Sequence, residues 1–187
     1  LAKRITNIEL GRNINSLNEL AGPVVVATDV TTAAQLLDMT SVPKLAVSTT
    51  WYHEVPTELT SSKCLVIDGQ KRGPVVNSIA ISNLAPTYAP AGKVLLSSTT
   101  VDFASESEVR RHLALIWGAQ SSEWSLIAKY EIPKSLPIFA PGVQGVTSAK
   151  VATNIYVAGD YRSAPSQNGA LLSGRLAAEE LLFDERS

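Results

Sequence analysis

The chain has 187 residues, of which 45% are hydrophobic and 18% are charged, and its formal net charge is -1. This supplies enough apolar material for one moderate domain or two small lobes, and the balanced charge gives no indication of a nucleic-acid partner. The single cysteine, Cys64, excludes an internal disulfide and a cysteine-rich structural metal site. Because Cys64 lies in the apolar run KCLVI, we expect it to be a small buried hydrophobe.

No uninterrupted apolar run approaches the roughly 20 residues that span a bilayer, and no secretory leader is visible. We therefore expect no integral membrane segment and a cytoplasmic location. The sequence begins at Leu1 without a methionine, amid strand-like and turn-like segments. We expect from this that an N-terminal part was removed, by design or by processing.

The N-terminal third predicts strands and one short helix. The first 22 residues alternate apolar positions with Asn and Gly, which predicts one or two short strands. Val24–Thr28 is a short β-branched run and predicts a fully buried strand of the parallel type. Thr31–Met39 predicts a short helix whose exposed N–H groups are capped by Asp29 or Thr31.

From Pro43 onward the sequence is rich in strand signals. Several β-rich stretches are separated by Pro, Gly and Asn, and no helix-length periodic segment lies between them. Strands in such succession favour antiparallel pairing through short loops. The predicted strands are Lys44–Val55, Lys63–Asp68, Val75–Ser82 and Lys93–Val101.

A clear helix follows these strands. Ser105 and Glu108 form a capping box, and one apolar stripe continues to Gly118. Ser122–Pro133 predicts another strand, after which a Pro/Gly-rich segment crosses back. The chain closes with a predicted strand at Ile155–Ala158 and a helix of small residues that ends near Leu182. One lobe, residues 1–30 and 146–187, is thus expected to be interrupted by another, residues 31–145.

The C-terminal stretch NIYVAGDYRSAPSQNGALLSGRLAAEELL places a carboxylate before a helix start without bulky side chains. Gly159 lets backbone and ligand approach closely, and Asp160 follows the strand end, where ligands bind in open α/β sheets. A carboxylate there accepts hydrogen bonds from ribose or ribityl hydroxyls. Ser166 is available as the N-cap, and Gly169 and Ala170 offer backbone N–H groups at the positive helix mouth. This favours the electron-rich edge of a flavin, with helix packing alone as the alternative explanation.

This stretch closely resembles the last motif of the flavin-containing amine oxidase and phytoene desaturase superfamily. There, Gly-Asp after the strand and Gly-Ala at the helix start hold FAD. Upstream, GPVVNSIAISNLAPTYAPAGKVLLSSTTV, HLALIWGAQSSEW, KYEIPKSLP and VVVAT resemble a bacterial and plastid branch of NAD(P)/FAD-dependent oxidoreductases.

The resemblance implies a mixed α/β (α+β) fold. Residues 31–145 would form a substrate-binding domain with an antiparallel sheet and helices. Residues 1–30 and 146–187 would form the returning strand and C-terminal helix of a Rossmann-like FAD-binding domain that is otherwise missing.

The resemblance also assigns site residues. Asp160 would meet the ribityl or phosphate-linked part of FAD, and the amides of Gly169 and Ala170 would face the flavin pyrimidine edge. Leu136-Pro137 would cross near the isoalloxazine ring, and Tyr130 would lie on the inner side of the substrate lobe.

Other residues carry weaker signals. Trp51 and Tyr52 alternate across a strand, so one faces the core and the other, Tyr52, is a candidate to line the substrate cavity. We expect His53 on a strand and His112 on the polar side of the helix that follows Ser105. The two histidines lie far apart without a nearby Ser or Cys pair, so we expect neither a nucleophilic triad nor a metal site. We expect Arg110-Arg111 to form a solvated helix face, and we name no catalytic residue.

One family element is absent from this sequence. No GxGxxG strand–turn–helix is present to cradle the FAD pyrophosphate. We therefore expect the chain to bind FAD weakly or not at all alone, and its partner to be the missing N-terminal FAD-binding domain of the same protein.

The parent enzyme is expected to remove a hydride from a C–H bond of a small, fairly apolar substrate. The pattern PSxxGAxxSGRxAAE resembles the desaturase side more than the amine oxidase side. The alternative is a non-enzymatic ligand-binding or interaction domain in which the flavin motif survives only as packing.

Overall fold

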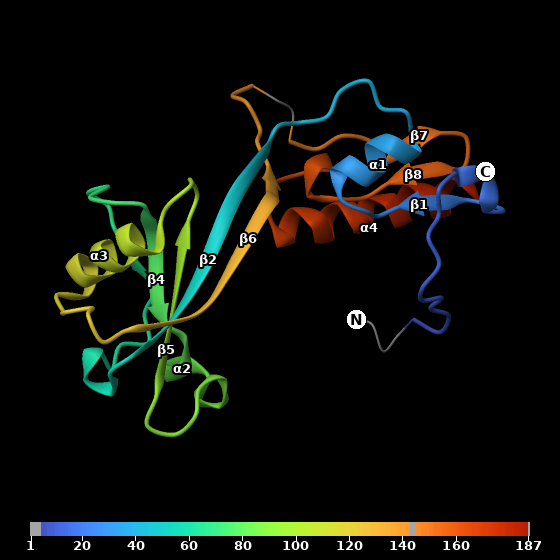
Figure 1. Cartoon of the computed structure of the whole chain (residues 1–187). Coiled ribbons are helices and arrows are strands. Elements are labelled where there is room, and N and C mark those ends of the chain that lie inside the picture. Colours follow the sequence, from blue (N-terminus) through green and yellow to red (C-terminus); the bar gives the residue numbers. More distant parts are fainter. Residues whose placement is uncertain (1–4, 143–144, 187) are drawn as a thin grey trace. The chain divides into compact units, whose positions relative to one another are not determined.

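The computed structural model describes residues 5–142 and 145–186, and the chain divides into two compact units. Unit 1 comprises Leu1–Lys44 and Pro137–Ser187, and unit 2 comprises Leu45–Leu136 (Figure 1). One unit therefore interrupts the other along the sequence. The boundaries differ from the expected 30 and 145, because the helix after Asp29 packs its Ala33 with Val26 and Val157 of unit 1.

Unit 1 is built on a three-stranded sheet of order β1-β8-β7. β1 (Val24–Val26) pairs in parallel with β8 (Ile155–Val157), in the register Val25 opposite Tyr156, so the predicted parallel pairing is confirmed. The strand is not fully buried as expected, because Val25 is exposed and only Val26 is buried. β7 (Lys150–Ala152) joins β8 as an antiparallel neighbour and was not predicted.

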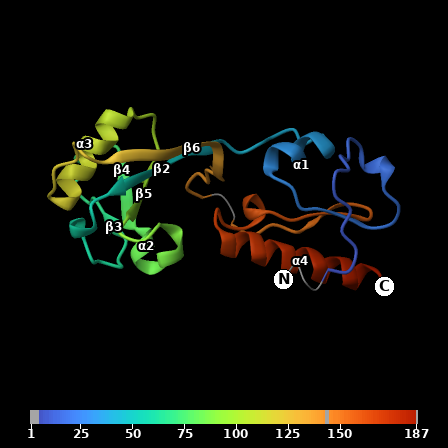
Figure 2. The same cartoon turned by 60° about the horizontal axis from the view of Figure 1, so that its bottom comes forward.

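The helices α1 (Val30–Leu36) and α4 (Gln167–Asp184) cover opposite faces of this sheet (Figures 1 and 2). The alternation of side chains along β8 explains the arrangement. Val157 faces α1 in a cluster with Val26 and Ala33, whereas Tyr156 and its neighbour Ala158 pack against α4. Of the two predicted caps of α1, Asp29 is the one used: its carboxylate accepts hydrogen bonds from the amides of Thr31 and Thr32.

Unit 2 is a five-stranded sheet of order β3-β4-β5-β2-β6. The pairs β3·β4 and β4·β5 join successive strands and are antiparallel, as predicted. β2 also pairs in antiparallel orientation with β5, although β3 and β4 lie between these two strands along the chain. The strands are β2 (Leu45–Val55), β3 (Val66–Ile67), β4 (Val75–Ala80), β5 (Val94–Thr100) and β6 (Ser125–Pro137).

Helix α3 (Glu106–Trp117) packs on one face of this sheet and closes the core of unit 2. The predicted capping box is present: Ser105 accepts from the amide of Glu108, and the Glu108 carboxylate accepts from the amide of Ser105 at 2.9 Å. The helix ends at Gly118 in the left-handed region, at φ 63°. Its stripe residues Val109 and Leu113 are fully buried.

Short helical turns complete the two units. In unit 1, η2 (Leu17–Glu19) precedes β1 and η5 (Asp160–Arg162) follows β8. In unit 2, α2 (Ile81–Leu84) continues β4, with η3 (Thr57–Leu59) and η4 (Pro86–Tyr88) in the connections. No helix among residues 5–142 and 145–186 is long and apolar enough to cross a membrane.

The structure contradicts three of the predictions made from the sequence. Residues 5–22 form no strand, and Ile8 and Leu10 are exposed because no described sheet edge pairs with this segment. Cys64 is exposed rather than buried, since β3 is limited to two residues and Cys64 precedes it in a turn. His112 lies in the core of unit 2 and not on the polar side of α3.

Candidate functional site

The C-terminal motif forms a strand, a turn and a helix within unit 1. Gly159 follows β8 with extended backbone, and a Cβ there would lie 2.2 Å from the Tyr161 ring. The packing of Tyr161 thus requires glycine at this position. The Gly159 amide donates a hydrogen bond of 2.6 Å to Ser173 Oγ, a buried hydroxyl of α4. The end of β8 is therefore fixed to the helix.

Asp160 is the first residue of η5 and is half-buried. Its backbone carbonyl accepts a hydrogen bond of 3.2 Å from the Ser163 amide. Its carboxylate, in contrast, makes no hydrogen bond or ion pair with any residue among 5–142 and 145–186. An unpartnered carboxylate after a parallel strand is able to accept hydrogen bonds from ligand hydroxyls.

At the start of α4, the backbone amides that lack a hydrogen-bond partner are not the ones that the sequence predicted. Ser166 is the N-cap as expected, and its Oγ accepts a hydrogen bond of 3.0 Å from the Gly169 amide. The Ala170 amide donates to the Ser166 carbonyl at 2.9 Å, which is the first regular bond of the helix. Both amides that were predicted to face a flavin are thus satisfied internally. No described residue accepts from the amides of Gln167 and Asn168, which are the free donors of this helix mouth.

The glycine at position 169 has a packing role of its own. A Cβ on Gly169 would lie 1.9 Å from the Ala164 carbonyl oxygen, so the turn before the helix passes directly against this residue. Further along α4, by contrast, a Cβ on Gly174 would meet no atom within 4 Å. The first glycine is therefore required by the fold, and the second is not.

The candidate substrate residues lie on neighbouring strands of unit 2. Tyr52 on β2 and Tyr130 on β6 form an edge-to-face pair with ring centroids 6.0 Å apart and an interplanar angle of 81°. Trp51 points to the other side of β2 and is buried, so the predicted division between core and surface is correct. Pro137, the third candidate, is buried at the end of β6 and belongs to unit 1.

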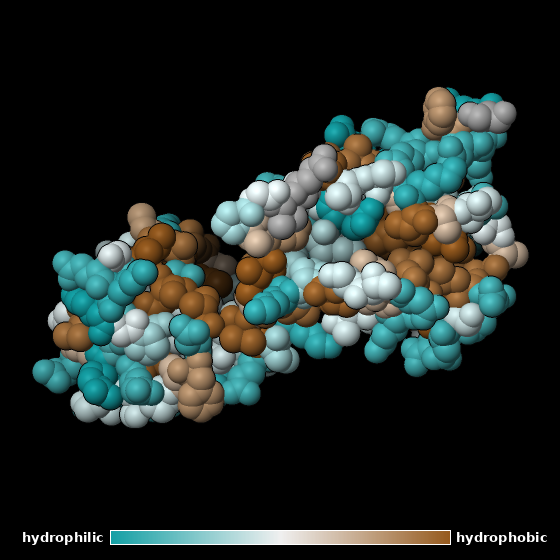
Figure 3. All heavy atoms as spheres, turned by 90° about the horizontal axis from the view of Figure 1, so that it is seen from above, coloured by the Kyte–Doolittle hydropathy of each residue, from teal (hydrophilic) through white to brown (hydrophobic). Residues whose placement is uncertain are grey.

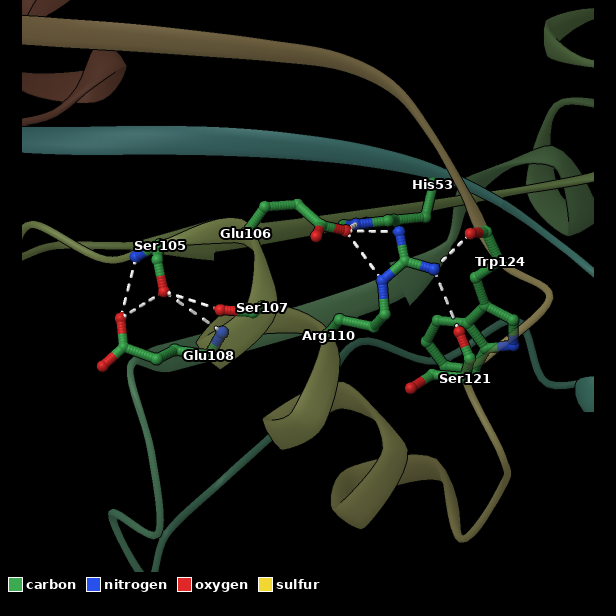
Figure 4. Close-up of polar contacts among 8 residues, drawn as sticks. All are labelled: His53, Ser105, Glu106, Ser107, Glu108, Arg110, Ser121 and Trp124. Atoms are coloured by element: carbon green, nitrogen blue, oxygen red, sulfur yellow. Dashed lines mark hydrogen bonds and ion pairs between the residues drawn. The ribbon is translucent and has the colours of Figure 1, made fainter.

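A polar network in unit 2 was not predicted (Figure 4). Glu106 Oε1 accepts from Arg110 Nε at 2.8 Å and lies 3.3 Å from His53 Nε2. Arg110 also donates to the backbone carbonyls of Ser121 and Trp124, which ties α3 to the start of β6. Arg110 is thus half-buried and structural, not part of a solvated face.

Burial and neighbouring charges shift the pKa values of two residues in this network, His53 and Glu106. Burial lowers the pKa of His53, although the hydrogen bond and charge of Glu106 act in the opposite direction. For Glu106, burial raises the pKa most strongly, but hydrogen bonds and charges from Arg110 and His53 outweigh it and the net pKa is lowered. The network links His53 to α3 through Nε2, whereas His53 Nδ1 is buried and has no hydrogen-bond partner among the described residues.

The second histidine is also structural. His112 Nδ1 accepts a hydrogen bond of 3.1 Å from the Val75 amide, and Nε2 lies 2.8 Å from Asp68 Oδ2. Nε2 therefore carries the proton and donates it to the carboxylate. The hydrogen bond from the Arg72 amide is the main cause that lowers the pKa of Asp68 to about 2. Burial acts in the opposite direction, and the hydrogen bond from His112 lowers the pKa further. With both ring nitrogens engaged, His112 has no lone pair left for general-base catalysis.

No metal site is formed by the described residues: none of their His, Cys, Asp and Glu side chains gather in a group of three or more. The candidate site is therefore the end of β8 together with the mouth of α4.

Comparison with known proteins places this motif in a family. Residues 15–182 match the profile of the flavin-containing amine oxidoreductases. The chain belongs to this family. The match covers most of the sequence, so the resemblance inferred from the C-terminal motif is confirmed.

Two solved structures share the fold. An oxidoreductase from Methanosarcina mazei aligns with a TM-score of 0.60 at 13% identity, covering 84% of this chain and 42% of its own. The PF1083 protein from Pyrococcus furiosus aligns with a TM-score of 0.57 at 15% identity, covering 84% of this chain and 40% of its own. The chain thus spans less than half the length of these proteins. No curated protein matches the chain.

Proposed function

We propose that this chain is the substrate-binding lobe, with the returning part of the FAD-binding domain, of an FAD-dependent oxidoreductase. The observation that carries the proposal is the unpartnered carboxylate of Asp160, which is separated only by the rest of η5 and a short turn from a helix mouth with two free amides. Membership in the flavin-containing family supports the same cofactor.

The residues present fit FAD chemically. Asp160 would accept hydrogen bonds from ribityl hydroxyls, which a carboxylate prefers to phosphate. The amides of Gln167 and Asn168, at the positive end of α4, would donate to the electron-rich pyrimidine edge of the flavin. FAD, when bound, supplies the hydride acceptor, so this chain need not provide a catalytic acid or base.

In this proposal unit 2 binds the substrate. The Tyr52–Tyr130 pair offers an aromatic surface on neighbouring strands. Such a surface suits a small, fairly apolar substrate and would orient its C–H bond. Pro137 contributes by fixing the end of β6 and not by direct contact, because it is buried.

The isolated chain is proposed to bind FAD weakly or not at all. The pyrophosphate of FAD is normally held by a GxGxxG loop and the following helix, and this sequence contains no such motif. Its proposed partner is therefore the N-terminal FAD-binding portion of the same protein, in the cytoplasm.

The proposed reaction is a desaturation, in which one C–H bond would give a hydride to FAD and the neighbouring carbon would give a proton to solvent, so that a C–C bond becomes C=C. Amine oxidation is the other branch of the family. The desaturase-like spacing PSxxGAxxSGRxAAE at residues 165–179 supports this preference. Anaerobic mixing of the FAD-loaded full-length product with polyenes and with amines tests it. Bleaching of the flavin by amines alone contradicts the desaturase assignment.

The role of Asp160 is tested by flavin content. In the full-length product, Asp160→Asn should lower the affinity for FAD by about tenfold or more, and with it the flavin content, because a charge-assisted hydrogen bond is replaced by a neutral one. Asp102→Asn is the matched control, since Asp102 is an exposed carboxylate of unit 2. Equal flavin content in both variants would remove Asp160 from the site.

A second function is favoured by one specific observation. Gly159 and Gly169 are both required by packing, against Tyr161 and Ala164 respectively, without any ligand. The motif would then be architecture in a non-enzymatic binding or interaction domain. A full-length product that stays colourless after reconstitution with FAD supports this alternative.

A further inference from the structure

A groove in unit 1 lies on the side of the sheet that carries α1. It has a volume of about 390 Å³ and lies among η2, the end of α1 and the β7–β8 hairpin. Figure 3 looks onto this side and shows apolar side chains gathered between polar ones. Its apolar walls include Leu17, Leu36, Met39, Val151 and Ile155.

One cationic side chain, Arg162, lines this groove. One of its terminal nitrogens donates to the Ser148 carbonyl, while its Nε is buried and has no hydrogen-bond partner. Among the described residues, no carboxylate forms an ion pair with Arg162. A half-buried guanidinium without a counter-ion is unusual, because desolvated charges in proteins are normally paired.

The charge and the walls together define the ligand. A guanidinium binds planar carboxylates through parallel N–H donors, and the apolar walls favour a hydrocarbon chain. Asp38 also lines the groove and forms no ion pair with Arg162; its negative charge repels a dianionic ligand more strongly than a monoanionic one. We propose that this groove binds a small monocarboxylate with an apolar chain, with the carboxylate on Arg162.

The site is separate from the proposed flavin contacts but adjoins them in sequence. Arg162 is the last residue of η5, the turn that begins with Asp160. The main chain of Arg162 is held as well, because its amide donates to the Gly159 carbonyl and its carbonyl accepts from the Thr147 amide. The binding proposal does not depend on flavin, so failure of the flavin assignment leaves it unchanged.

The test is an NMR titration of the whole chain with hexanoate. Shifts should concentrate on the amides of the groove, and hexanol should bind at least about tenfold more weakly because it lacks the charge. Inorganic phosphate, which lacks the chain, should also bind more weakly. Equal binding of hexanol overturns the role of Arg162, and equal binding of phosphate overturns the role of the apolar walls.

Variants locate the site. Arg162→Gln should weaken hexanoate binding at least about tenfold, whereas Arg175→Gln, an equal charge change on the exposed side of α4, should leave it unchanged. Val151→Trp fills the groove without altering Arg162 and should abolish binding even if Arg162→Gln fails to fold. Unchanged affinity in Val151→Trp, or shifts outside the groove, would contradict the proposal.

Discussion

Unit 2 encloses one cluster of ten buried hydrophobic residues, including Trp51 and Trp124, between its sheet and α3. Unit 1 has instead two small clusters of four and three buried residues, one on each face of a three-stranded sheet. The cluster of unit 2 includes two tryptophans and two leucines, whereas every residue in the clusters of unit 1 except Tyr156 is alanine or valine. Unit 2 therefore has a hydrophobic core of its own, while unit 1 depends more on polar contacts and on close approach between backbone segments.

Those polar contacts hold α4 to the β7–β8 hairpin. The Glu180 carboxylate accepts from the amides of Ala149 and Lys150 at 3.0 and 2.8 Å. Burial raises the pKa of Glu180, but these and other hydrogen bonds outweigh it and the net pKa is lowered. Asp184 accepts a hydrogen bond of 2.5 Å from the Tyr156 hydroxyl, and this bond raises the pKa of Tyr156 to about 12.

The largest effect is expected in the core of unit 2. Leu113→Ala removes a fully buried side chain and should lower the free energy of unfolding of unit 2 by about 2–5 kcal/mol. Leu115→Ala, on the exposed side of the same helix, should change it by less than about 0.5 kcal/mol. Urea denaturation followed by tryptophan fluorescence measures both. Similar losses would contradict the location of the core.

In unit 1 the substitution with the largest expected effect on stability is at a glycine, Gly169. Gly169→Ala places a methyl group against the Ala164 carbonyl and should destabilise α4 by about 1–3 kcal/mol. Gly174→Ala adds the same methyl group in open space and should stabilise the helix by about 0.5–1 kcal/mol. Hydrogen exchange of the α4 amides measures the two changes, which must have opposite signs.

Helix capping allows a direct comparison of the units. Ser166→Ala removes the N-cap of α4 and Ser105→Ala removes that of α3, and each should cost about 1 kcal/mol. Because unit 1 has less core to hold its helix, exchange in the first turn should increase more for Ser166→Ala. A larger increase in α3 would reverse the comparison.

The smallest effect concerns pH. Burial lowers the pKa of His53 below its ordinary value of 6.5, so below that pH the unfolded chain binds a proton that the folded chain does not. The stability of unit 2 should therefore fall slightly as the pH drops from about 6.5 to 5. His53→Gln should flatten this dependence in denaturation curves recorded across that window. An unchanged slope in the variant would assign the effect to other groups.

Local signals predicted much of the fold. The β-branched run at β1, the capping box of α3 and the serine cap of α4 are encoded by adjacent residues, and each was recovered from sequence. The antiparallel pairing of β3, β4 and β5 followed from their succession along the chain, whereas the position of β2 beside β5 could not be predicted from it. β7 was missed because three exposed residues carry no burial pattern and are defined only by their pairing with β8.

The parts that sequence could not predict depend on distant partners. Arg110 is structural because the carbonyls of Ser121 and Trp124 lie beside it, and His112 is buried because Asp68 and Val75 supply its hydrogen bonds. At the candidate site, Asp160 and Ser166 could be named from the motif. The sequence could not predict which amides of α4 remain without a hydrogen-bond partner, because this depends on the rotamer of the capping serine, Ser166.

The most direct test of the flavin assignment is the visible absorbance spectrum of the full-length gene product, with this chain measured alongside after addition of FAD. We predict flavin bands in the full-length product and none retained by this chain after desalting, since this sequence contains no GxGxxG motif to hold the FAD pyrophosphate. A full-length product that remains colourless after reconstitution with FAD would contradict the account. Asp160 and the mouth of α4 would then serve only the architecture of unit 1.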